Sequence, residues 1–306
     1  MESMLFASIK PMLATVGDEP FDDEDFLFEP KWDGARMLLH KQGERIEAYT
    51  RSGRRVTDKF PELKEAALAI IAEQAVLDCE GVCMNGGRAV FDDFAYRLRL
   101  GDSRRIAAAA RSHPASWIAF DVLATTREHL REPLHDRKRI VNECIEPSER
   151  LSPCAFLMGR GKALYDWTKE HRLEGIVAKR RYSGYQAGVV SADWIKVKHP
   201  VEIDAIILGY RMLPVFAFVI GLHFRTVRFK PVGLVEAGIS AEQRAAFLGI
   251  VAGGLHAKQE GTTQWLKPAL CCRIEYRDRS DWHELSGTTF KGFLPDKRVD
   301  DCMWTY

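Results

Sequence analysis

The stretch Glu29-Pro30-Lys31-Trp32-Asp33-Gly34-Ala35-Arg36 brings a lysine, carboxylates, a glycine and an arginine together in one short segment. A lysine amine can act as a covalent nucleophile, and a guanidinium group suits phosphate. The glycine lets backbone approach a ligand closely, and Glu29 can accept a hydrogen bond from the exocyclic amino group of a base. The stretch therefore predicts a site that handles a nucleotide phosphate. Asp33-Gly34 between apolar runs is also an ordinary hairpin signal.

Size and composition indicate a globular protein of two domains. The chain has 306 residues, enough for each domain to bury its own core. The net charge is only +1, so attraction to nucleic acid must come from local basic stretches, here 97–111, 127–139 and 179–181. Seven cysteines without a C-x-x-C pair are typical of reduced core thiols.

Membrane insertion and export are not expected. The longest apolar segment, near 214–222, is shorter than the run of about 18 residues that a membrane helix requires. The first residues lack the basic and apolar regions of a signal peptide. We expect a protein of the cytoplasm or nucleoid.

Apolar spacing predicts mixed secondary structure in the first 200 residues. Short strands and turns are expected over 28–49, and an amphipathic helix is expected over 58–73, capped by Asp58. Further strands are expected at 75–84, 117–123, 175–179 and 194–198, and helices at 91–100, 103–111, up to 144, and 161–171.

The pattern changes after His199-Pro200. Short strands are expected at 204–209, 215–222, 226–231, 265–267 and 271–276, with one helix over 240–251. Several short strands with a single helix fit a small barrel such as an OB-fold.

Six motifs occur in an order that resembles the covalent nucleotidyltransferases, the superfamily of ATP-dependent DNA ligases, RNA ligases and mRNA capping enzymes. The first is the K-x-D-G-x-R pattern of Lys31 to Arg36, and the Glu-Pro before it makes the chain most similar to a DNA ligase. Cys79 stands where the family usually has a glycine. The other five motifs are Thr50-Arg51-Ser52-Gly53, Leu77-Asp78-Cys79-Glu80-Gly81, Phe120-Asp121, Leu173 to Lys179 and Trp194 to Lys198.

The resemblance implies an α+β fold. A nucleotidyltransferase domain over residues 1–200, ATP-grasp-like with two antiparallel sheets and helices, would precede a small OB-fold β-barrel over 201–306. This layout is similar to the minimal bacterial ligases of end joining and base repair, without fused polymerase or nuclease modules. A monomer is expected.

The resemblance also implies roles for particular residues. Lys31 would take AMP from ATP as a phosphoramidate, with Asp33, Arg36, Lys196 and Lys198 as the other catalytic residues. Glu80 and Glu174 would hold Mg²⁺, or Mn²⁺, because Mg²⁺ prefers oxygen ligands and usually one or two carboxylates. The expected nucleotide-binding residues are Glu29, Lys31, Arg36, Arg51, Glu80, Phe120, Glu174, Lys179, Lys196 and Lys198, with the ring of Phe120 stacked on the base.

The chemistry of these residues supports those roles. A free lysine has a pKa of about 10.4, and lowering it by about three units requires about 4 kcal/mol of differential interaction. We expect a bound divalent cation, Lys196 and Lys198 to supply that positive potential. Charge on the transferring phosphoryl group is best met by Mg²⁺ and by lysine or arginine. Glu29 predicts ATP over GTP, because adenine presents an exocyclic donor where guanine presents an acceptor.

The segment Ser286 to Lys297 departs from the family pattern. It resembles the terminal motif R-x-x-x-F-K-G-L-R-x-D-K, which orients the pyrophosphate in end-joining ligases. Ser286 and Leu294 occupy its two arginine positions, whereas Lys291, Asp296 and Lys297 remain. Lysine does not replace the bidentate phosphate contact of arginine, so we expect slower self-adenylation or a higher ATP requirement.

Other functions stay open from the sequence. The first alternative is an RNA ligase or capping guanylyltransferase, and the second is a DNA-end-binding module without turnover. For the ligase, the expected partner is nicked or broken double-stranded DNA, bound mainly through phosphate contacts. Ku is implied as a partner by the resemblance alone.

Overall fold

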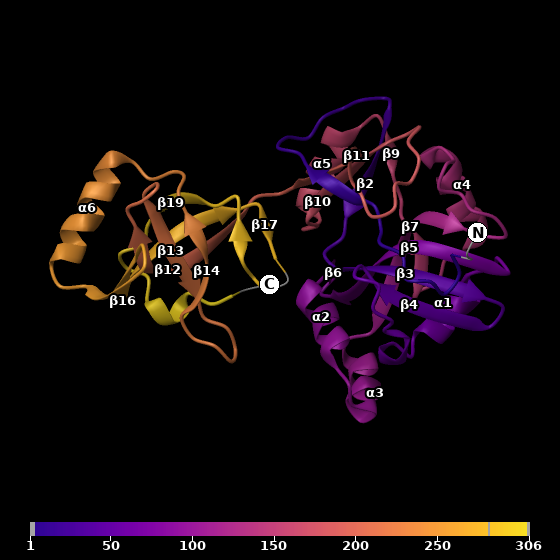
Figure 1. The fold of residues 1–306 in the computed structure, drawn as a ribbon, viewed down its shortest axis with the longest axis horizontal. Coiled ribbons are helices and arrows are strands. Elements are labelled where there is room, and N and C mark those ends of the chain that lie inside the picture. Colours follow the sequence, from indigo (N-terminus) through magenta and orange to yellow (C-terminus); the bar gives the residue numbers. More distant parts are fainter. Residues whose placement is uncertain (1–3, 281, 305–306) are drawn as a thin grey trace. The chain divides into compact units, whose positions relative to one another are not determined.

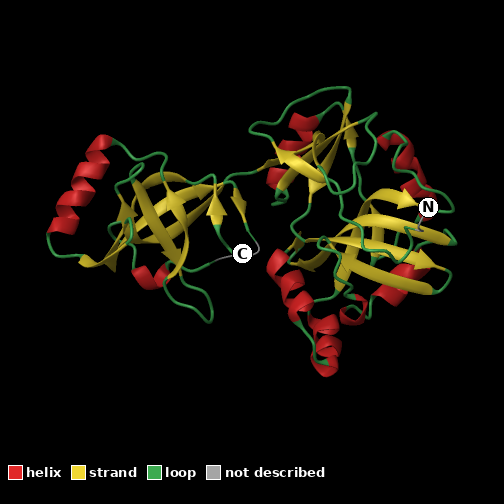
Figure 2. Ribbon diagram, viewed as in Figure 1, coloured by secondary structure: helices red, strands yellow, loops and turns green. Residues whose placement is uncertain are grey.

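The chain divides into two compact units in this computed structural model, which describes residues 4–280 and 282–304. Unit 1 covers Met1–Lys198 and unit 2 covers His199–Tyr306 (Figure 1). Each unit combines strands with helices, as the predicted α+β class requires (Figure 2). Within the described ranges, no helix has the length and apolar character needed to cross a membrane.

The larger sheet of unit 1 carries most of its core. Its strand order is β4-β3-β5-β7-β8, with β6 paired to β5. One face packs against helices α1, α2 and α4, where Phe60 and Phe94 stack at 5.0 Å and Trp117 is fully buried. The strands are β3 (Ala35–Gln42), β4 (Arg45–Thr50), β5 (Gln74–Asn85), β6 (Arg88–Ala89), β7 (Ala115–Ala124) and β8 (Leu151–Pro153).

The second sheet of unit 1 has the strand order β1-β11-β10-β2-β9. Helix α5 packs on it, against β2 and β10. The strands are β1 (Leu13–Val16), β2 (Phe26–Lys31), β9 (Leu157–Met158), β10 (Gly175–Arg180) and β11 (Val190–Lys198).

The prediction of two antiparallel sheets is wrong in detail, because each sheet has one parallel pair. β1 runs parallel to β11, and β7 runs parallel to β8. Parallel neighbours require a crossover connection, which α4 supplies between β7 and β8. Unit 1 is therefore built of mixed sheets.

Among the helices described in unit 1, α2, α3, α4 and α5 agree with the sequence periodicity, but α1 is much shorter than predicted. Asp58 lies in a separate 3-10 turn, Thr57–Lys59, and Pro61 lacks the N–H that a continuous helix through it would need. At the other end Ile70 is extended and forms a bridge to Ile145, which leaves Ile71 60% exposed. The helices are α1 (Leu63–Ala69), α2 (Phe91–Arg99), α3 (Ser103–Ser112), α4 (Leu134–Cys144) and α5 (Gly161–Glu170).

In the residues that the structure describes, unit 2 has a six-stranded sheet and one α-helix, α6 (Ala241–Ala252), whose start is stabilised by a capping box between Ser240 and Gln243. The strand order is β14-β13-β12-β16-β15, with β19 also paired to β16. The named strands of the described ranges follow an open path, so the expected closed barrel is not formed by them. The strands are β12 (Val201–Arg211), β13 (Ala217–Leu222), β14 (Lys230–Val235), β15 (His256–Glu260), β16 (Thr263–Tyr276) and β19 (Thr289–Phe293), beside the small pair β17 (Asp278–Arg279) and β18 (Leu285–Ser286).

Two strand predictions in unit 2 need correction. The segments 265–267 and 271–276 belong to one strand, β16, because Pro268 falls where the register with β12 shifts. A proline, which cannot donate to a sheet, is tolerated at such a bulge. The strand expected over 226–231 begins only at Lys230, since Phe229 has a left-handed φ of 53° and its N–H donates to Nδ1 of His223.

Candidate active site

Lys31 ends strand β2, and the pairing of β2 with β10 sets it opposite Gly175, beside Glu174. Its Nζ lies 2.6 Å from Oε2 of Glu174, and both side chains are 22% exposed. Lys198, at the end of β11, pairs with the other oxygen of Glu174. These three residues, here called the Lys31 cluster, join the first and the last two sequence motifs of unit 1.

The charges around Lys31 favour its protonated form. Burial opposes the positive charge, but the carboxylates of Glu174, Glu80 and Asp33 outweigh it and raise the pKa of Lys31 above its usual value. Burial also raises the pKa of Glu80, to about 7, whereas Lys31 and Lys198 overcome burial at Glu174 and lower its pKa to about 2. This arrangement favours the ammonium form of Lys31, and positive charge placed near Glu174 and Glu80 would favour loss of its proton.

The two carboxylates suit a divalent cation that is also held by phosphate. Glu174 contacts Lys31, and the charge of Glu80 also helps to raise the pKa of Lys31. Mg²⁺ is usually bound by one or two carboxylates together with substrate phosphates. Within residues 4–280 and 282–304, no group of three or more His, Cys, Asp or Glu side chains could hold an ion by itself. The donor set therefore fits a shared ion and does not form a closed protein metal site.

Glu29 lies two residues before Lys31 on β2, opposite Val177 of β10, but its surroundings are quite different. Its side chain is only 3% exposed, and it pairs with Lys179 of β10 at 2.8 Å and with Lys138 of α4. Both lysines are equally buried. Glu29, Lys138 and Lys179, here called the Glu29 cluster, bury two cations around one carboxylate. Recognition of adenine by Glu29 stays a prediction.

Arg36 lies near the start of β3. Its guanidinium donates two hydrogen bonds, of 2.7 and 2.5 Å, to the carboxylate of Asp78 on β5. Tyr185 donates to the same carboxylate at 2.6 Å. Gly34, just before β3, is required by packing, because a Cβ there would lie 2.3 Å from the carbonyl oxygen of Gly81. The predicted contact of Arg36 with phosphate is untested.

The other predicted residues lie around these clusters. Phe120 on β7 is 8% exposed, and Lys179 Nζ stands 4.2 Å from its ring centroid. Lys196 is on β11, opposite Val177, so it shares the sheet with Lys31. Arg51 is exposed on the turn after β4, and its backbone N–H donates to the carbonyl of Arg36.

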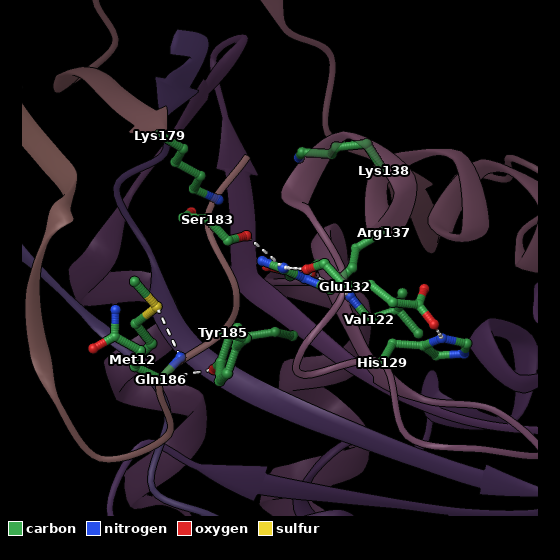
Figure 3. A network of polar contacts seen from close by, with 12 residues as sticks. Met12, Val122, His129, Glu132, Arg137, Lys138, Lys179, Ser183, Tyr185 and Gln186 are labelled. Carbon is green, nitrogen blue, oxygen red and sulfur yellow. Dashed lines mark hydrogen bonds and ion pairs between the residues drawn. The ribbon is translucent and has the colours of Figure 1, made fainter. Parts of the chain in front are cut away.

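A buried network that the motifs alone did not indicate supports this region (Figure 3). Arg137 of α4 binds Asp121 of β7 through two hydrogen bonds of 2.8 and 2.9 Å and also donates to the carbonyl of Ser183. Both side chains of the pair are fully buried. Arg137 and Lys138 belong to the basic stretch 127–139, whose surface or buried position the sequence could not distinguish. Tyr185 had no sequence signal.

The terminal motif lies in unit 2. Ser286 ends β18, and the backbone N–H of Leu294 donates to the carbonyl of Cys271. Lys291 pairs with Glu275 at 2.8 Å, and Lys297 pairs with Asp204 at 3.0 Å. Both retained lysines thus have acidic partners within their own unit.

Known DNA ligases and end-joining ligases are similar to this chain. A profile of the ATP dependent DNA ligase domain matches residues 6–198. The multifunctional non-homologous end joining protein LigD of Mycolicibacterium smegmatis is 26% identical over 324 residues, 96% of this chain and 39% of that protein. The SPbeta prophage-derived DNA ligase-like protein LigB of Bacillus subtilis is 32% identical over 203 residues, 66% of this chain and 72% of that protein.

A solved ligase structure is similar to this chain over nearly its whole length. The ligase domain of M. tuberculosis LigD superposes with a TM-score of 0.58 at 25% identity, over 97% of this chain and 98% of that domain. Mixed sheets around a lysine paired with a motif glutamate define a ligase domain of the nucleotidyltransferase fold. The chain belongs to the family of ATP-dependent DNA ligases, as its motifs indicated. It spans 39% and 40% of the length of two LigD proteins that it matches.

Proposed function

We propose that this chain seals nicks or ends in duplex DNA through a lysyl-AMP intermediate formed on Lys31. The observation that carries the proposal is the Lys31 cluster, because the family's lysine, glutamate and last lysine meet within ion-pair distance. A mycobacterial DNA ligase D of similar fold, 26% identical, has been solved in complex with ATP.

The proposed reaction has three steps. The Lys31 amine, after losing its proton, attacks the α phosphorus of ATP, so that a P–N bond forms and the bond to pyrophosphate breaks. A 5′ phosphate at the nick then displaces the lysine and takes AMP. The adjacent 3′ hydroxyl attacks that phosphate, forming the phosphodiester and releasing AMP.

Residues around Lys31 have defined tasks in this proposal. A bound Mg²⁺ or Mn²⁺, held by Glu80, Glu174 and phosphate, would neutralise phosphoryl charge. Neutralising those carboxylates removes the attraction that keeps Lys31 protonated. Lys196, Lys198 and Arg36 would bind phosphate oxygens, Asp33 and Arg51 would support the nucleotide site, and Glu29, Lys179 and Phe120 would bind the base.

The test is adenylation with labelled ATP, followed by a chase onto nicked duplex DNA, with wild type and Lys31→Ala side by side. We expect a labelled protein that passes its label to DNA, and no labelling of the variant. Labelling by GTP would instead favour a capping guanylyltransferase, and transfer of AMP to RNA but not to DNA would favour an RNA ligase. Absence of any lysine-linked AMP would favour a DNA-end-binding module.

The wider biology is also a proposal. We infer a monomer that works in DNA repair or end joining in the cytoplasm or nucleoid, with Ku as a partner suggested by likeness to LigD alone. Unit 2 is proposed as an OB-fold domain, supported by the bridge between Ala237 and Thr289 that links the segment after β14 to β19. Binding of nicked DNA should fall steeply with added salt, because phosphate contacts release counterions.

A further inference from the structure

Lys138 is a second buried lysine on the carboxylate proposed to read adenine. It comes from α4, far in sequence from the β2 and β10 strands that carry Glu29 and Lys179. Figure 3 shows the amino ends of Lys138 on α4 and Lys179 on β10 directed toward each other. Lys179 contacts Oε2 of Glu29, whereas Lys138 contacts Oε1. Each oxygen of the carboxylate therefore has its own cation.

The second cation is not needed to neutralise Glu29. One lysine would balance its charge, and burying an additional ammonium group is costly unless it has a task or a partner. Asp121, an acid whose charge interacts with both lysines, is already bound through two hydrogen bonds by Arg137. The Glu29 cluster therefore holds one more buried lysine than the charge of Glu29 alone would balance.

The cluster also has unused hydrogen-bonding capacity. Within the described ranges, Oε1 of Glu29 and Nζ of Lys138 are buried and meet as an ion pair, without a further hydrogen-bond partner. Buried polar groups in proteins are normally hydrogen-bonded. A planar base edge with a donor beside an acceptor would satisfy such a set.

The two lysines face different surroundings. Lys179 Nζ stands 4.2 Å from the ring centroid of Phe120, the residue expected to stack on the base, and 4.1 Å from that of Trp194. Lys138 Nζ lies 5.6 Å from the ring centroid of Phe156, in the segment between β8 and β9. Lys179 is thus on the Phe120 side of Glu29, and Lys138 holds the other oxygen.

We propose that Lys138 is a positioning residue for base recognition, which fixes the Glu29 carboxylate so that it accepts from the 6-amino group of adenine. This inference rests on the proposed function, in which ATP adenylates Lys31. Lys138 would act through Glu29 and would not take part in phosphoryl transfer. Its loss should therefore weaken nucleotide selection more than the chemical step.

The experiment measures self-adenylation of the full chain with ATP and with purine riboside triphosphate, which lacks the 6-amino group. In Lys138→Met we expect KM for ATP to rise about tenfold, equivalent to the loss of about 1.4 kcal/mol. KM for the analogue should change less than twofold, so the preference for ATP largely disappears, and kcat should stay within about twofold. Lys138→Arg should restore most of the preference.

Arg139→Met is the matched control, because Arg139 is on the same helix but its side chain is 63% exposed and pairs with Glu143. It should behave as wild type with both nucleotides. If Lys138→Met does not fold, the single variant Glu29→Gln is compared with the double variant Glu29→Gln/Lys138→Met. The double variant removes the buried carboxylate and its lysine partner together. The second change should then add nothing to KM for ATP, because Lys138 acts through Glu29.

Three outcomes overturn the proposal. An equal rise of KM for ATP and for the analogue in Lys138→Met would indicate a general structural role. Unchanged KM values in that variant, or additive effects in the Glu29→Gln background, would also refute the link to Glu29. In each case wild-type labelling at Lys31 leaves the proposed function standing. Failure of wild type to form an AMP adduct would remove the proposed function and this inference together.

Discussion

The Lys31 cluster and the Glu29 cluster have the same composition, a glutamate between two lysines, in very different environments. Side chains of the Lys31–Glu174 pair are 22% exposed, whereas all three side chains of the Glu29 cluster are 2–3% exposed. Their key residues, Lys31 and Glu29, lie only two positions apart on β2. The two clusters therefore differ in burial and not in residue type. The partly exposed Lys31 cluster is suited to exchange its partners, whereas the buried Glu29 cluster is suited to keep them.

The physical basis of this difference is desolvation. A partly exposed ion pair contributes little to stability because water screens it and can replace either partner. A buried pair contributes strongly only as a complete set, since removal of one member leaves an uncompensated charge. The Lys31 cluster can thus open for phosphate and a cation, while the Glu29 cluster can hold a fixed geometry for a base.

Substitution of Lys31 should have the largest effect on activity and a small effect on folding. We expect Lys31→Ala to lower AMP-adduct formation by at least about a thousandfold, because the nucleophile is lost. The free energy of unfolding should change much less, because water reaches the 22% exposed side chain and Lys198 still pairs with Glu174. Adduct labelling and urea unfolding measure the two effects. A large loss of stability would mean that the cluster is structurally fixed.

Substitution of Glu29 should affect stability more than substitution of Lys31 does. We expect Glu29→Gln to lower the free energy of unfolding by about 3 kcal/mol, because Lys138 and Lys179 lose their buried counter-ion. The matched change Glu174→Gln should cost less, because water reaches the 22% exposed side chain and screens its charge. Urea unfolding of both variants tests the contrast, which equal losses would contradict. Labelling of Glu29→Gln at low ATP should also be weaker than that of wild type.

The pH dependence of stability should distinguish the two acids beside Lys31. The pKa of Glu80 is raised from 4.5 to about 7, so its contribution is greatest below pH 4.5 and declines as the pH rises to 7. The pKa of Glu174 is lowered to about 2, so its contribution is present above pH 4.5 and is lost as the pH falls toward 2. Relative to wild type, Glu80→Gln should gain stability between pH 4.5 and 7.

Urea unfolding of wild type, Glu80→Gln and Glu174→Gln across this pH range measures both effects. Between pH 4.5 and 7, the Glu174→Gln curve should decline less than wild type, because the charge of Glu174 helps to raise the pKa of Glu80. Parallel curves for Glu80→Gln in the same window would show that Glu80 titrates as an ordinary surface acid.

Restoring an arginine of the terminal motif should have the smallest effect. We expect Leu294→Arg to speed self-adenylation a few fold at low ATP, because arginine binds phosphate through two parallel hydrogen bonds. Leu294 is partly buried against the core of unit 2, so a modest loss of stability should accompany the change. Rates at several ATP concentrations test this, and no acceleration would mean that Leu294 does not limit the first step.

The motifs were sufficient to identify the family and most elements of unit 1. Strand β5, helices α2 and α3 and the lysine of β2 follow from apolar periodicity and from short patterns whose chemistry is local. Helix α1 was predicted too long because Ile70 leaves the helix to pair with Ile145, a contact between distant segments. The uninterrupted β16 likewise depended on a register shift against β12 that accommodates Pro268.

The amino-acid sequence by itself predicted which groups would carry chemistry, because Lys31, Glu29, Glu80 and Glu174 occur in recognisable patterns. Only the tertiary structure decided their charge states and partners. In the folded chain Glu174 pairs with Lys31 and Lys198, and Lys138 of α4 pairs with Glu29 of β2. The reason is physical, since burial and distance between side chains set desolvation and Coulomb energies, and neither quantity is a property of the chain before it folds.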